Sequence, residues 1–147
     1  MANPLRLSKG EVIAGEVISE QDIEALDDAY IAGAFGKGVT ETTIADGASM
    51  TFTAANLLSC IISATPTAAR NIASPTAATI IAAVDAGTQI GLGFEFVIIN
   101  KAASTYALTL TAGTGVTLVG SATISAATSA SFFARIDSAT AVSIFRK

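Results

Sequence analysis

The sequence predicts a mainly β protein: an antiparallel β-sandwich or a jelly-roll-like barrel with one short helix, preceded by an N-terminal arm with a short helix. Two observations predict the β domain. Apolar and polar residues alternate in short segments, and turn residues separate these segments at regular intervals. The charge distribution predicts the arm, because residues 1–46 hold nine acidic and three basic residues, whereas residues 47–147 hold three and five. We therefore place a domain boundary near Gly47.

The arm, residues 1–46, contains two short extended pieces followed by a helix. Gly10-Glu11-Val12-Ile13 recurs as Gly15-Glu16-Val17-Ile18, and each unit is typical of a few strand residues with a bend at glycine. Ser19 then begins a capping-box pattern, which predicts a helix that ends near Gly33. Elements this short bury no core alone, so we expect the arm to lie on a partner or on the β domain.

The strands of the β domain, residues 47–147, follow from period-2 alternation. They are predicted at 51–53, 57–63, 94–99, 106–111, 116–119, 123–125, 131–136 and 141–145, with a short extended piece at 70–73. Short strands at such spacing are typical of an antiparallel sandwich or barrel. We interpret 113–120 as a hairpin turn, since it lacks the Lys-Ser/Thr of a phosphate-binding loop and leads into a strand.

An Ala-rich segment with two prolines, residues 64–87, interrupts the strands. Ser74 followed by Pro75 predicts a helix N-cap and first helical position, and 76–84 then forms about two turns with its apolar residues facing inward. A helix this short is marginal in isolation. We expect it either to plug an open end of the sandwich or to cross from one sheet to the other.

The composition argues against most catalytic and binding sites. The absence of His removes the commonest general base and most zinc sites, and Glu95 and Asp137 are isolated acids in the sequence. A net charge of −4 without a Lys/Arg cluster argues against nucleic-acid binding, and no apolar stretch is long enough for a membrane span. We interpret the single Cys60 as a buried structural thiol. We therefore predict a protein that is not an enzyme and that uses no cofactor or metal.

The surface is predicted to be covered by other chains. Only 14% of the residues are charged, below the usual quarter, and residues 47–147 are rich in Ala, Ser and Thr. A monomer with so few charges would expose much uncharged surface to water. This composition favours a subunit of a larger assembly.

Four segments of the β domain carry a resemblance to a known family: 65–70, 74–84, 91–100 and 108–118. In this order they resemble a domain common in structural proteins of tailed bacteriophages, among them capsid decoration (cement) proteins and head-fibre or tail-associated proteins. The resemblance covers roughly residues 50–146. It implies a β-rich domain, often trimeric, that is displayed on the virion, and a variable N-terminal segment that attaches to the shell.

These observations lead us to expect a capsid decoration protein, made in the host cytoplasm and located on the capsid surface of the virion. As a homotrimer it would bridge subunits of the major capsid protein, with no nucleic-acid or membrane partner. The candidate contacts with the shell are Leu5, Arg6, Leu7, Val12, Ile13, Val17 and Ile18. The alternative is a head-fibre or tail adaptor that binds a host receptor through loops such as 101–105 and 113–115. A polysaccharide-degrading enzyme is a third hypothesis, disfavoured by the absence of His and Trp.

Overall fold

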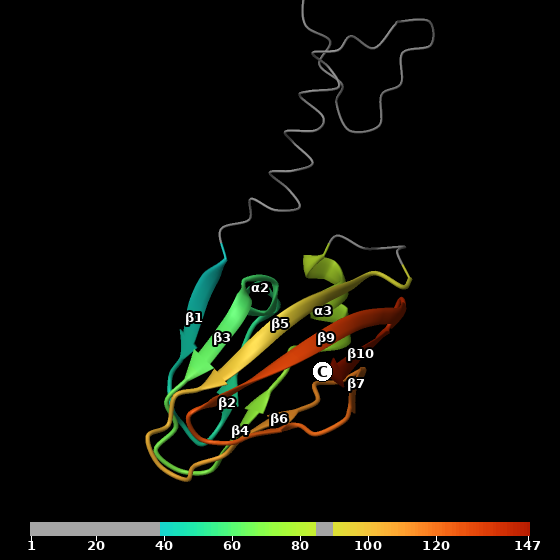
Figure 1. Cartoon of the computed structure of the whole chain (residues 1–147). Coiled ribbons are helices and arrows are strands. Elements are labelled where there is room, and N and C mark those ends of the chain that lie inside the picture. Colours follow the sequence, from blue (N-terminus) through green and yellow to red (C-terminus); the bar gives the residue numbers. More distant parts are fainter. Residues whose placement is uncertain (1–38, 85–89) are drawn as a thin grey trace, which may run out of the picture. The chain divides into compact units, whose positions relative to one another are not determined.

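A computed structural model describes residues 39–84 and 90–147 (Figure 1). Within these residues the chain forms two sheets and two short helices, so the predicted mainly β class is confirmed. The larger sheet has the strand order β1-β3-β5-β9-β10-β7, and the smaller has the order β2-β4-β6-β8. The strands are β1 (Thr40–Ile44), β2 (Met50–Thr51), β3 (Cys60–Ala64), β4 (Arg70–Ala73), β5 (Gly93–Asn100), β6 (Leu108–Thr111), β7 (Val116–Val119), β8 (Thr123–Ile124), β9 (Thr128–Ser138) and β10 (Ala141–Arg146). The helices are α2 (Ala54–Leu58) and α3 (Ala77–Ala83).

The prediction of antiparallel sheets is wrong for most of the described strand pairs. From β1 to β9 the chain alternates between the two sheets, and from β1 to β6 each strand returns to its own sheet in the same direction as before. The parallel pairs are β1–β3, β3–β5, β2–β4, β4–β6 and β7–β10. Parallel neighbours need a crossover connection, and here a strand of the opposite sheet supplies it. Antiparallel pairing occurs at β5–β9, β9–β10 and β6–β8.

Strand β1 lies inside the segment that we assigned to the arm. It pairs in parallel with β3 along its whole length, from Thr40 opposite Cys60 to Ile44 opposite Ala64. The compact β unit accordingly begins at Val39 rather than near Gly47. The charge distribution placed this boundary too far along the chain. The acidic residues of β1 and of the turn after it belong to the β unit, because their basic partners lie there.

Helix α2 replaces the first part of the strand predicted at 57–63. Thr53 is its N-cap and forms a capping box with Asn56, in which each side chain accepts a hydrogen bond from the other's backbone amide. The helix ends at Leu58, and Cys60 adopts a left-handed φ of 71° before β3 continues. Cys60 is half-buried, so the prediction of a buried thiol is wrong.

Helix α3 crosses from the smaller sheet to the larger, which confirms one of the two roles expected of it. It lies between β4 and β5, which belong to different sheets, and its residues Ile80 and Ile81 are buried. Its N-cap is Thr76 rather than Ser74. The hydroxyl oxygen of Ser74 instead accepts a hydrogen bond from the backbone amide of Gly113, at 2.9 Å.

The core fills the space between the sheets, and phenylalanines dominate its centre. The rings of Phe96 and Phe132 stack with centroids 5.4 Å apart, and Phe52 lies 6.4 Å from Phe96. The guanidinium of Arg146 extends this row, with its central carbon 5.3 Å from the centroid of the Phe132 ring. Branched aliphatic side chains surround the row: Ile62, Ile72, Ile80, Ile98, Leu108, Leu110, Ile124, Ile136 and Ile144.

The turn predicted at 113–120 is a corner between sheets and not a hairpin. Strand β6, which precedes it, belongs to the smaller sheet, and β7 belongs to the larger. The backbone here packs closely: a Cβ on Gly113 would lie 2.5 Å from the carbonyl oxygen of Pro75. Only glycine fits such an approach.

Candidate functional site

Four loops gather at one end of the sandwich, which we call the loop end: 45–49, 65–69, 101–107 and 125–127 (Figure 1). The strand register explains this, because Ile44, Ala64, Asn100 and Thr128 stand side by side across β1, β3, β5 and β9. Each of these residues borders one of the loops. The parallel β1–β3 and β3–β5 pairs and the antiparallel β5–β9 pair therefore bring together segments that are far apart in the sequence.

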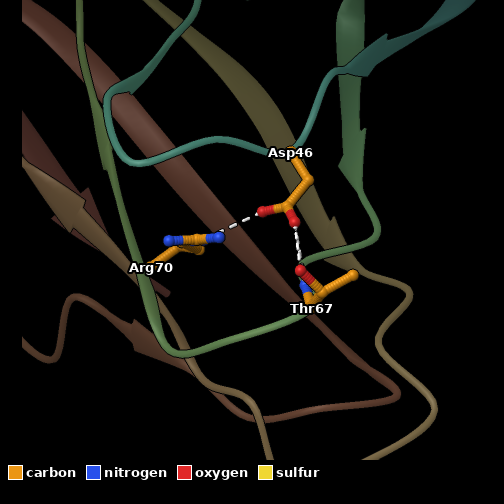
Figure 2. Close-up of polar contacts among 3 residues, drawn as sticks. All are labelled: Asp46, Thr67 and Arg70. Atoms are coloured by element: carbon orange, nitrogen blue, oxygen red, sulfur yellow. Dashed lines mark hydrogen bonds and ion pairs between the residues drawn. The ribbon is translucent and has the colours of Figure 1, made fainter.

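Asp46 joins two of these loops (Figure 2). Its Oδ2 accepts hydrogen bonds from the backbone amide of Thr67 at 3.2 Å and from the Thr67 hydroxyl at 2.5 Å. Its Oδ1 accepts from Nε of Arg70 at 2.9 Å. The bonds from Thr67, and then the Arg70 guanidinium, lower the pKa of Asp46 from 3.8 to about 2. This carboxylate is ionised and occupied by its partners, so it ties loop 45–49 to loop 65–69 and is unsuited to proton transfer.

Asn100 anchors a third loop. Its side chain is fully buried, and its Nδ2 donates to the carbonyl oxygens of Tyr106 at 2.8 Å and Ile124 at 3.0 Å. Its Oδ1 accepts from the backbone amide of Ala102 at 3.1 Å. Because Ile124 belongs to β8, one side chain holds loop 101–107 and also links the two sheets. Next to it, Lys101 forms an ion pair with Glu41 of β1.

Shallow depressions lie between loops 101–107 and 125–127. Small side chains line them, chiefly Ala102, Ala103, Ser104, Ala126 and Ala127, and the one charged lining residue is Lys101. A ligand site normally combines an enclosed apolar pocket with a few convergent polar groups. The depressions at the loop end are open and lined mainly by small side chains.

All four carboxylates in the described residues have basic partners. The ion pairs are Glu41–Lys101, Asp46–Arg70, Glu95–Lys147 and Asp137–Arg135. The Ser143 hydroxyl, and then Arg135, lower the pKa of Asp137. Glu95 and Asp137 are thus held in separate ion pairs and not as a catalytic pair.

Residues 39–84 and 90–147 contain no group of three or more side chains that could hold a metal ion. In the same ranges, neither helix has the length and apolar character needed to cross a membrane.

The sequence-predicted site residues fall into two sets. The candidate shell contacts, Leu5, Arg6, Leu7, Val12, Ile13, Val17 and Ile18, lie outside the described residues. The two loops of the receptor-binding alternative, 101–105 and 113–115, lie before and after β6, at its opposite ends. Asp46 and Asn100 were not singled out from the sequence, because each lies beside a turn and its partners come from distant loops.

Comparison of the chain with known protein families, curated proteins and solved structures finds no match. Its function is therefore inferred from its own residues, charges and fold.

Proposed function

We propose that this chain is a virion structural protein that decorates and stabilises a bacteriophage capsid by bridging subunits of the major capsid protein as a homotrimer. The separation of charge along the chain carries this proposal. Residues 1–38 hold seven acidic and three basic residues, which accounts for the whole net charge of −4, while residues 39–147 hold five of each. The chain thus joins a neutral β unit to an acidic segment.

The acidic segment, residues 1–38, has the composition of an attachment element. It combines its negative charge with the apolar pairs Val12-Ile13 and Val17-Ile18, and with Leu5 and Leu7. Apolar side chains supply buried area on a partner, and the acidic groups favour a basic surface on that partner. The β unit pairs its own described carboxylates internally, so its charges do not compete for this surface.

Bridging explains how such a protein stabilises a shell without catalysing a reaction. Three linked attachment segments bind with greater avidity than one, because the second and third contacts form at high effective concentration. A ligand that binds only the assembled shell shifts the equilibrium toward the assembled state. The segments that resemble structural proteins of tailed bacteriophages support a place in the virion, which decoration and head-fibre proteins share.

Deletion of residues 1–32 tests the proposal. The truncated chain retains all of the described β unit, which begins at Val39, and it is expected to lose binding to purified shells. Binding is measured by co-sedimentation, and circular dichroism checks that the β unit is intact. The control is Thr123→Asp, which adds an acidic group at an exposed site on β8 and is expected to leave shell binding unchanged. A truncated protein that still coats shells would refute attachment through this segment.

A further inference from the structure

The outer face of the larger sheet is covered by none of the described elements. The inner face carries Phe96, Ile98 and Phe132, which are buried against the core. Because side chains alternate along a strand, Val97, Ile99 and their neighbours in register point to the opposite side. Figure 1 shows β3, β5 and β9 crossing this side with no described helix or loop over them.

Apolar side chains occupy two parts of this outer face. Ile61, Val97 and Ile99 lie on β3 and β5, and Phe133, Phe145 and Val119 lie on β9, β10 and β7. None of the six is among the residues that pack against the core. Val119 is 45% exposed, and the other five are half-buried.

Both aromatic rings on this face lie against other groups of the sheet. A Cβ on Gly93 would lie 2.2 Å from Cζ of Phe133, so this ring rests directly on the backbone of β5. Arg135 lies over the ring of Phe145, with its central carbon 5.4 Å from the ring centroid.

The charges on this face cancel one another. Glu95 pairs with Lys147, and Asp137 with Arg135, so these four groups contribute no net charge. Two copies of a chain with a net charge of −4 repel one another in general, but this face can meet its own copy without that repulsion. The acidic segment, residues 1–38, finds no complementary charge on a neutral face.

The area is sufficient for a specific contact. The six strands lie about 4.8 Å apart and the eight residues of β5 span about 3.3 Å each, so the face measures roughly 600 Å². Two such faces together bury about 1,200 Å², the lower end for stable protein interfaces. This area is reached when the whole face of one copy meets the whole face of a second copy.

We propose that the outer face of the larger sheet is the surface through which copies of this chain associate. This inference rests on the proposed self-association of the chain and names its contact surface.

Lysine substitutions on the full-length chain test it by sedimentation velocity over a range of concentrations. Val97→Lys and Ser131→Lys place a charge at paired positions on β5 and β9, and Ser131 is exposed, so its substitution spares the core. The control is Asn71→Lys, at an exposed site on β4 in the smaller sheet. We expect the wild type and the control to form the same oligomer, and both face variants to associate at least about tenfold more weakly. Thermal melting checks that each variant is folded.

A wild type that stays monomeric, or face variants that associate like the control, would overturn the inference. Loss of the oligomer on deletion of residues 1–32 would also overturn it, because the acidic segment would then supply the contact. A dimer dispersed by the two face substitutions would support the surface and contradict the trimer. Shell binding is measured separately, so a monomer that still coats shells would reject this inference and leave attachment standing.

Discussion

Replacing Asn100 by alanine is expected to destabilise the β unit strongly. The buried side chain makes three hydrogen bonds, to the carbonyl oxygens of Tyr106 and Ile124 and from the amide of Ala102. At about 1 kcal/mol for each bond, the loss is about 3 kcal/mol. This is a large part of the roughly 5–15 kcal/mol that stabilises a typical domain. The backbone groups left without partners add to the cost, since burial keeps water from replacing the amide.

Thermal and urea unfolding, followed by circular dichroism, measure this effect. A loss of about 3 kcal/mol lowers the Tm of a domain of about 100 residues by roughly 10 °C or more. The matched control is Asn71→Ala, which removes the same side chain from an exposed position on β4 and is expected to change stability by less than about 0.5 kcal/mol. If the two variants melt at the same temperature, Asn100 does not anchor the loop end.

Three further outcomes are expected. Thr67 and then Arg70 lower the pKa of Asp46 from 3.8 to about 2, so its contribution to the free energy of unfolding is present above pH 3.8 and is lost as the pH falls through about 2. In urea titrations at several pH values, Asp46→Asn should reduce this loss of stability at low pH. A variant whose free energy of unfolding falls with pH as the wild type's does would contradict the contact. Gly113→Ala should lower the Tm, because its Cβ would lie 2.5 Å from a carbonyl oxygen. The control is Gly47→Ala, whose Cβ would have no atom within 4 Å. If both variants melt at the same temperature, the close approach at Gly113 is contradicted. Shell binding should weaken as salt is raised in co-sedimentation, because ions screen exposed charges; salt-independent binding would contradict an electrostatic role for the acidic segment.

The positions of the strands from β5 to β10 could largely be predicted from the sequence, but the pairing direction could not. Alternation places Phe96 and Ile98 inward and Glu95 outward whether the neighbouring strands run parallel or antiparallel. The direction depends on the chain changing sheets after nearly every strand, which no local pattern records. The start of the β unit was misplaced for a related reason, since the partners of Glu41 and Asp46 lie far along the chain.

Helix α2 and the loop end show the limits of local signals. The apolar run 57–63 is one stretch in the sequence, yet it contains a helix end, a left-handed residue at Cys60 and the start of β3. No glycine marks the break, so the run was predicted as one strand. The contact between Asp46 and Thr67 spans 21 residues and exists only because parallel register aligns their loops.

The copy number of this chain in purified virus particles tests the proposed function most directly. Quantitative mass spectrometry gives it relative to the most abundant shell protein. Decoration of the lattice predicts a fixed small-integer ratio between the two proteins throughout the shell. Only a few copies per particle would favour the head-fibre or tail adaptor, and complete absence from the particle would contradict a structural role in the virion.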